Sequence, residues 1–151
     1  MSRRPLPRDF DVDYELTRLV RRVRMGSIRR LSEIHPELDY NAFLLFIAIA
    51  DEPRGVRASD LADILHVHKS TVSRAVTALE KLDLVQREAD PDDGRAQVLT
   101  ITADARTRLE AFRARSHAWL ATLLEDWEPQ ELTSFARQLA RLNDTAETKQ
   151  R

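Results

Sequence analysis

The hydrophobic pattern of this 151-residue chain is clearest between Ser59 and Ile101, where it predicts a helix, a tight turn, a second helix and a two-stranded hairpin. Apolar residues of the second helix recur at spacings of three and four, so they gather on one face and form a buried stripe. Ser59 is the expected cap of the first helix, Leu61 to Leu65. The stripe consists of Val72, Ala75, Val76, Leu79 and Leu82.

Two short strands are predicted after this helix, at Leu84 to Glu88 and at Gln97 to Ile101. Asp93-Gly94 between them is a strong signal for a hairpin turn. Val56 to Ala58 are expected to form a short third strand beside the hairpin. The tight turn between the helices needs a residue that tolerates a positive φ, and His66 fits because His is enriched there among residues other than Gly.

Longer helices are predicted on both sides of this segment. His35-Pro36 ends the first of them, because the residue before a proline disfavours the helical region. Tyr40 to Ala50 is apolar nearly all round, which predicts a buried central helix. Thr102 is the expected cap of the helix after the hairpin, and Pro129 fits the first position of the last helix. The expected outer helices are residues 9–34, 40–50, 103–126 and a last one from 129.

The polar face of the second helix carries hydroxyl and basic side chains. No carboxylate occurs from Val67 to Leu79, although the chain has 25 acidic residues. Such side chains can contact base edges and phosphate oxygens in a major groove, where a nearby carboxylate would be repelled. His68 stands where a capping residue is expected, so it either weakens the cap or lies near a phosphate. The candidate DNA-binding residues here are His68, Lys69, Ser70, Thr71, Ser73, Arg74 and Thr77.

A resemblance to the winged helix-turn-helix of the MarR family of bacterial transcription regulators is carried by LADILHVHKSTVSRAVTALEKLDLV followed by DPDDGRAQVLTIT. TVSR alone occurs in many helix-turn-helix proteins, but TVSR with the wing-tip pattern DP..D.R and a trailing LT.T is much more specific. The resemblance implies a homodimeric DNA-binding protein, usually a repressor, whose affinity for DNA is often lowered by a small ligand or by oxidation. The chain has no Cys, so a cysteine-based redox switch is excluded.

The hairpin then corresponds to the wing of that family. Arg95 resembles the wing-tip arginine, which can enter a narrow minor groove, and Asp93 matches the acidic residue that steadies it. Arg87 is a candidate phosphate contact. Asp90 and Asp92 would repel phosphate if they faced it, so we expect them to point outward. The alternative is a plain surface pair on a solvated hairpin.

The fold class predicted is mainly α with a small β wing, a winged helix-turn-helix flanked by N- and C-terminal dimerisation helices. The predicted parts are a flexible arm (1–8), a dimerisation lobe (9–55 and 103–146, with the buried central helix 40–51), a DNA-binding lobe (56–102) and a frayed tail (147–151). An intramolecular core could use the same apolar residues of the outer helices. The candidate dimerisation residues are Leu16, Leu19, Leu132, Phe135, Leu139 and Leu142.

In the resembled family, effectors often lodge between the two lobes. A small aromatic or phenolic effector could bind there, with a His as its polar partner. The alternative is that these aromatic residues belong to the core, which is the more frequent role of aromatics at helical spacing. The candidate pocket residues are His35, Tyr40, Phe43, Phe46, Phe112, His117 and Trp119.

Composition narrows the function further. The net charge is −1, and the segment from Ser59 to Ile101 holds five basic and eight acidic residues, so DNA binding must depend on where the basic groups lie. No apolar run approaches a membrane span, which makes the cytoplasm the expected location. No glycine-rich phosphate loop or catalytic motif is present, so no enzyme activity and no cofactor or metal is expected. The alternatives are a winged-helix module that binds protein and a metal-responsive regulator, for which His66 and His68 lack a third ligand nearby in sequence.

Overall fold

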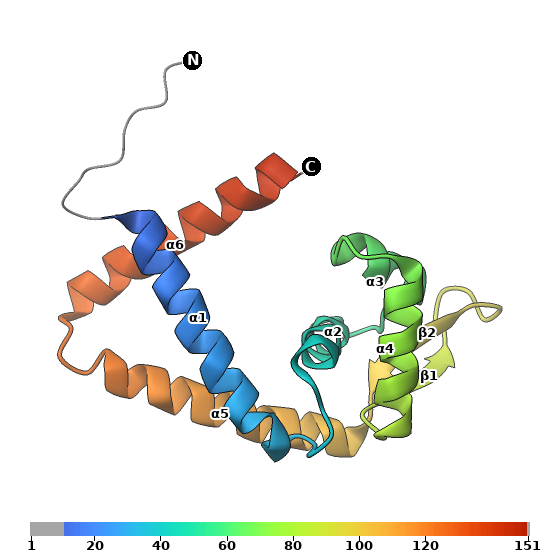
Figure 1. The fold of residues 1–151 in the computed structure, drawn as a ribbon. Helices are drawn as coiled ribbons and strands as arrows, with labels where there is room; N and C mark the ends of the chain where they lie inside the picture. The colour runs from blue at the N-terminus through green and yellow to red at the C-terminus, as the bar shows by residue number, and fades with distance from the viewer. Residues whose placement is uncertain (1–10, 151) are drawn as a thin grey trace. The chain divides into compact units, whose positions relative to one another are not determined.

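A computed structural model describes residues 11–150 of the chain, in which helices and one small sheet follow one another (Figure 1). The chain folds as two compact units that divide between Phe112 and Arg113. The predicted arm, residues 1–8, lies outside the described residues. The elements are α1 (Val12–Arg30), the 3-10 helix η1 (Leu31–Glu33), α2 (Tyr40–Ala50), α3 (Ala58–Ile64), α4 (Lys69–Lys81), β1 (Val85–Ala89), β2 (Gln97–Ile101), α5 (Ala103–Leu123) and α6 (Pro129–Gln150).

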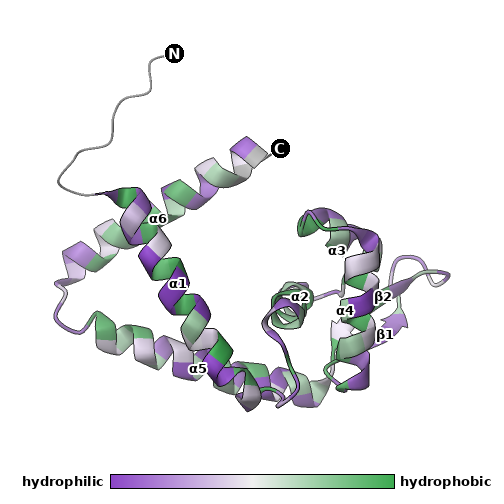
Figure 2. Ribbon diagram, viewed as in Figure 1, coloured by the Kyte–Doolittle hydropathy of each residue, from purple (hydrophilic) through white to green (hydrophobic). Residues whose placement is uncertain are grey.

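The core of the first unit is built around α2. Phe46 at its centre is fully buried, and the helix packs against α4 and β2. Figure 2 shows that α2 is hydrophobic around most of its circumference, as its sequence predicts. The core residues of the other elements include Leu61 and Ala62 of α3, Val72, Val76 and Leu79 of α4, Leu99 and Ile101 of β2, and Leu109 and Phe112 of α5.

The core around α2 joins residues from both predicted lobes. The sequence assigns residues 40–51 to the dimerisation lobe, and α2 shares one core with η1 and α5 of that lobe and also with α3, α4 and the strands. An all-round apolar helix must be buried, but its own pattern does not say which elements cover it. The predicted tail also differs, since α6 runs to Gln150 and so extends into residues 147–151.

The entry into α3 corrects the predicted cap. The N-cap is Arg57, not Ser59, and Ser59 lies inside the first turn with its hydroxyl donating to Asp60. The reason lies in the preceding residue: Val56 and Leu99 exchange two backbone hydrogen bonds of 3.1 and 2.8 Å. This bridge, a single pair where a third strand was expected, keeps the chain extended up to Arg57, so the helix begins directly afterwards.

The turn between α3 and α4 confirms the conformation expected at His66, whose φ is 52°. His68 is the N-cap of α4 and makes no capping hydrogen bond through its side chain. The first turns of α4 are instead held by the packing of its apolar stripe, in which Val72 and Val76 are almost completely buried.

The two strands form an antiparallel hairpin in which Val85 pairs with Ile101 and Ala89 pairs with Gln97. The connection between them is residues 90–96, longer than a two-residue turn. The amide of Asp90 donates to the carbonyl of Ala96, and the amide of Ala96 donates to the carbonyl of Asp93. After the second strand, Thr102 caps α5 as predicted, because its hydroxyl oxygen accepts from the amide of Ala105 at 3.2 Å.

The second unit contains the end of α5 and all of α6, which starts at Pro129 as predicted. Trp127 and Phe135 stack at a tilt of 54° across the turn between the two helices. Several large apolar side chains of this unit remain exposed, and in the first unit α1 buries no residue. No helix among residues 11–150 is long and apolar enough to cross a membrane. The exposed large apolar residues of the second unit are Trp119, Leu120, Leu123, Trp127, Phe135 and Leu142.

Candidate nucleic-acid interface

The predicted contact residues on α4 carry only hydroxyl and basic side chains, and every one of them is exposed. The opposite face of the helix buries Val72, Val76 and Leu79 in the core. The buried stripe thus fixes the rotation of the helix and determines which side chains face outward. The exposed candidates are Lys69, Ser70, Thr71, Ser73, Arg74 and Thr77.

Local hydrogen bonds orient two of these side chains. The Nε of Arg74 donates to the carbonyl of Ser70 at 3.3 Å, and the hydroxyl of Thr77 donates to the carbonyl of Ser73 at 2.9 Å. Neither Lys69 nor Arg74 forms an ion pair with any residue that the structure describes. Their charges are therefore available to an anionic partner such as a phosphate group.

The wing carries the exposed Arg95, but its neighbour Asp93 contacts it differently from what the resemblance implies. The carboxylate of Asp93 accepts from the backbone amide of Arg95 at 3.2 Å, and its ion pair is with Arg57 at 3.7 Å. Arg87, the candidate phosphate contact, pairs with Glu80 of α4, with 2.8 Å between Nε and Oε1. The guanidinium of Arg87 therefore joins the wing to the recognition helix.

Asp90 and Asp92 were both expected to point outward; this is wrong for Asp90, which is buried, whereas Asp92 is exposed. Asp90 is 9% exposed, and its Oδ2 accepts from Nε of Arg57 at 2.8 Å and from Nη2 at 2.5 Å. Asp92 is exposed and pairs with Arg54 at 2.8 Å. Sequence reasoning overlooked Arg54 and Arg57 because more than thirty residues separate each from its partner. The only feature of the sequence that could have pointed to these contacts is the presence of two arginines, Arg54 and Arg57, directly before α3.

The environment of Asp90 stabilises its charged form. A hydrogen bond from the backbone amide of Asp92 and one from the guanidinium of Arg57 hold the pKa of Asp90 below its usual value. In return, the hydrogen bond and charge of Asp90 raise the pKa of Arg57 above its ordinary value. The pair is thus fully ionised at neutral pH.

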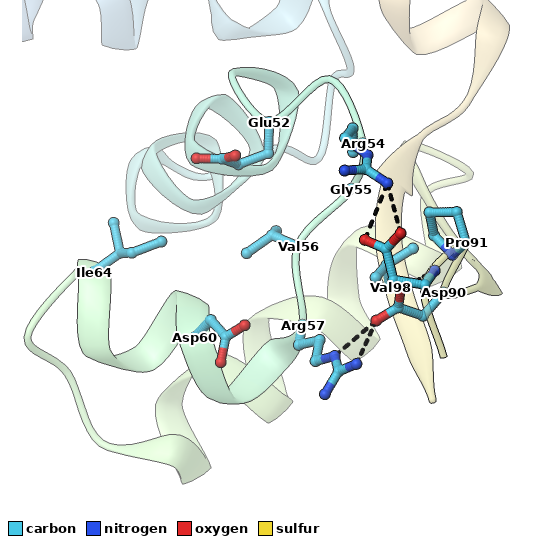
Figure 3. Close-up of a pocket in the computed structure, with 11 residues that line it drawn as sticks. Glu52, Arg54, Gly55, Val56, Arg57, Asp60, Ile64, Asp90, Pro91 and Val98 are labelled. Carbon is cyan, nitrogen blue, oxygen red and sulfur yellow. Dashed lines mark hydrogen bonds and ion pairs between the residues drawn. The ribbon is translucent and has the colours of Figure 1, made fainter. Parts of the chain in front are cut away.

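Gly55 allows the Arg54–Arg57 segment to approach the wing. Its φ is +78°, a conformation that other L residues rarely adopt, and a Cβ at this position would lie 2.8 Å from Cγ2 of Val98. Glycine therefore permits both the backbone turn and the close approach to β2 that bring the two arginines beside the acidic wing connection (Figure 3).

The aromatic residues of the candidate ligand pocket that belong to the first unit are packed in its core. Phe46 is fully buried, and Phe43 meets Phe112 edge to face with 5.5 Å between ring centroids. Tyr40 is half-buried, with Arg24 above its ring at 5.0 Å. His35 accepts from the amide of Glu37 through Nδ1. The remaining candidates, His117 and Trp119, are exposed residues of the second unit.

The six candidate dimerisation residues lie on α1 and α6. Leu16, Leu132 and Leu139 are half-buried within the single chain, and the other three are exposed: Leu19, Phe135 and Leu142. Among residues 11–150, no group of three or more His, Asp or Glu side chains could hold a metal ion.

Comparison with known proteins agrees with this geometry. The model of the MarR family matches residues 37–96, which include α2, α3, α4, β1 and the connection that follows β1. The uncharacterized HTH-type transcriptional regulator YxaD of Bacillus subtilis (strain 168) is 31% identical over 140 residues, covering 87% of this chain and 90% of that protein.

Solved structures share the fold over nearly the whole chain. A crystal structure of MarR has a TM-score of 0.74 at 24% identity and covers 97% of this chain and 98% of that chain. Streptococcus pneumoniae FabT in complex with DNA has a TM-score of 0.76 at 17% identity, covering 91% and 96% of the two chains. For an S. aureus MepR-DNA complex the TM-score is 0.69 at 18% identity, with 93% and 99% covered. The chain therefore belongs to the MarR family of winged helix-turn-helix transcriptional regulators, which are not enzymes.

Proposed function

We propose that two copies of the chain form a dimer in the cytoplasm that binds a pseudo-palindromic DNA site. Each α4 lies in a major groove, and the two grooves are about one helical turn apart. The observation that carries this proposal is the exposed face of α4 from Lys69 to Thr77, which has no carboxylate and lies opposite the buried Val72, Val76 and Leu79. Two proteins of similar fold, FabT and MepR, have been crystallised with DNA, which supports the same role here.

The experiment that tests this proposal is selection of bound duplexes from a random DNA pool at near-physiological salt. Enrichment of a pseudo-palindrome with half-sites about one helical turn apart would support sequence-specific binding by a dimer. Binding without sequence enrichment, and lost at moderate salt, would contradict it. That result would favour a winged-helix module that binds protein, although such modules suit an acidic or apolar recognition face and α4 has neither.

The wing contributes through Arg95, whose guanidinium enters the minor groove beside the major-groove contact. Replacement of Arg95 by Ala is expected to weaken binding to the selected site by about tenfold, and to lower the slope of log K against log salt by about one. Fluorescence anisotropy over a salt series measures both quantities. The control is replacement by Ala of the exposed Lys149 near the end of α6, which removes the same charge at a position distant in sequence from the wing. This variant should change neither the affinity nor the slope. An unchanged slope for the Arg95 variant would remove the wing from the mechanism.

Dimer formation is supported by the apolar side chains that one chain leaves exposed on α1 and α6. An exposed leucine such as Leu142 would be buried only by a second copy. Replacement of Leu142 by Asp is expected to raise the dimer dissociation constant by about a hundredfold, because a carboxylate would be buried without a partner. Sedimentation equilibrium measures the constant. Ser134→Asp lies on another face of the same helix, so it adds the same charge and should leave the dimer intact. Equal dissociation of both variants would contradict a dimer interface that contains Leu142.

We propose repression as the mode of regulation, because a dimer that covers its site excludes other proteins from that DNA. A small aromatic or phenolic effector that binds only a conformer with the wrong spacing of recognition helices would lower DNA affinity by linkage. Thermal shift with aromatic acids tests for such a ligand. A rise in melting temperature without loss of DNA binding would argue against release by that ligand.

A further inference from the structure

The wing connection, residues 90–96, is attached to the segment before α3 by three ion pairs. Arg57 pairs with Asp90 and Asp93, and Arg54 pairs with Asp92. Figure 3 shows the two arginines reaching from the Arg54–Arg57 segment toward the acidic connection. Four of these residues also line a pocket of about 270 Å³ beside the wing: Arg54, Arg57, Asp90 and Asp92.

The two attachments differ in their surroundings. In the Arg54–Asp92 pair, both side chains are more than two-thirds exposed, at 71% and 73%. Pairs of this kind contribute little to structure, because water screens the charges and both side chains lose freedom. In the Arg57–Asp90 pair, the Asp90 side chain is only 9% exposed, and Arg57 donates to it through two nitrogens. The second pair therefore fixes the connection much more firmly than the first.

Arg57 is linked through this pair to the backbone of the wing tip. The other oxygen of Asp90 accepts from the amide of Asp92 at 2.9 Å. Asp93, the second partner of Arg57, accepts from the amide of Arg95. One guanidinium thus holds two carboxylates, and each carboxylate holds a backbone amide of the connection. The second of these amides is that of Arg95 itself, the wing arginine.

We propose that Arg57 is a positioning residue for DNA binding: through Asp90 and Asp93 it holds the wing connection in one conformation, so that Arg95 is already placed for the minor groove in the free protein. The proposal rests on the DNA-binding function above and assigns to Arg57 no contact with DNA. A loop that is ordered before binding loses less conformational entropy on binding, so it gains affinity. We call the ion pairs of Arg57 with Asp90 and Asp93 the anchor. Removal of the anchor should therefore lower the affinity for DNA through its effect on Arg95.

The substitution Asp90→Asn distinguishes this role from plain electrostatics. It removes a negative charge from a wing that faces DNA, so charge alone predicts tighter binding. Positioning predicts binding about tenfold weaker, since the asparagine cannot hold the Arg57 guanidinium as an ion pair. Asp92→Asn is the matched control, because it removes the same charge from the same connection but breaks only the exposed pair with Arg54. We expect it to leave affinity unchanged or slightly raised.

Arg57→Lys distinguishes positioning from a direct phosphate contact. Lysine keeps the charge but lacks the planar fork that donates to Asp90 through two nitrogens. A phosphate contact would survive this change, whereas positioning predicts that Arg57→Lys binds DNA as weakly as Arg57→Ala. Arg54→Ala, which removes the same charge from the same segment, should bind nearly as the parent does.

A double-mutant cycle between Asp90→Asn and Arg95→Ala tests whether the two residues act together. Fluorescence anisotropy with the selected duplex measures the affinity of each variant. Arg95→Ala should weaken binding about tenfold in the parent and less than about twofold in the Asp90→Asn background. The cycle with Arg74→Ala should instead be additive, because α4 does not depend on the anchor. Additive effects of Asp90→Asn and Arg95→Ala, or tighter binding by Asp90→Asn, would overturn the proposal.

A second readout needs no DNA, so it separates failure of this proposal from failure of the proposed function. Hydrogen exchange of the Asp92 and Arg95 amides should be faster in Asp90→Asn than in the parent, while the amides of α4 keep their protection. Unchanged exchange at both amides would refute the anchor even if the protein binds DNA. Faster exchange in a protein that selects no DNA site would uphold the anchor and contradict only the DNA-binding function.

Discussion

Replacement of Ser73 by Asp is expected to abolish sequence-specific DNA binding, with affinity for the selected duplex reduced by about a hundredfold or more. Ser73 lies in the middle of the exposed face of α4, where residues from Val67 to Leu79 include no carboxylate. A carboxylate at this position would face phosphate and base acceptors, and such like-charge contacts cost several kcal/mol in an interface, which corresponds to a factor of about a hundred or more. Anisotropy with the selected duplex measures the loss, and circular dichroism checks that α4 still forms.

Ser32→Asp is the control for this variant. Ser32 is an exposed serine of η1, so the substitution adds the same charge to the same unit without touching the recognition helix. It should lower affinity only slightly, through the change in net charge. If both aspartates weakened binding equally, the effect would come from overall charge, and the α4 face would lose its assigned role.

Replacement of Phe46 by Ala is expected to lower the free energy of unfolding by about 3–5 kcal/mol, the usual range for a buried phenylalanine. Phe46 is completely buried at the centre of the α2 core, where α3, α4 and β2 also meet. Truncation removes apolar contacts and leaves a cavity that a close-packed interior refills only in part. Since small domains are stable by only about 5–15 kcal/mol, this change should remove a large share of the stability.

Urea unfolding at one fixed protein concentration measures this effect, because dimer formation would make the midpoint depend on concentration. Leu44→Ala on the same helix provides the comparison. The Leu44 side chain is 46% exposed, so its truncation should cost far less. If Phe46 instead lined an effector cavity, as the sequence also allowed, its truncation would cost little stability and would change effector binding.

Much of the fold followed from local sequence because local physics decides it. The stripe of α4 requires one buried face, and that requirement also determines which hydroxyl and basic residues are exposed. The positive φ at His66, the cap by Thr102 and the start of α6 at Pro129 were likewise predictable, since each depends on a residue and its near neighbours. The family resemblance rests on these same local features.

Features that depend on residues distant in sequence were not predictable in this way. Ser59 is a good capping residue, but α3 starts earlier because Val56 pairs with Leu99 on a strand more than forty residues away. Asp90 was expected to point outward because its carboxylate would repel phosphate, and no local pattern shows that Arg57 will lie beside it. The helix α2 was rightly predicted to be buried, yet its own pattern does not show that elements of both predicted lobes cover it.

By itself, the sequence therefore determined the order of helices, the hairpin, the outward face of α4 and the wing arginine, because periodicity, capping and turn preferences act over a few residues. Only the tertiary structure decided which core α2 joins, where α3 begins, and that Arg54 and Arg57 hold the acidic wing connection. Ion pairs between distant segments depend on how the chain brings them together, and the placement of Arg57 beside Asp90 further requires the close approach that Gly55 permits.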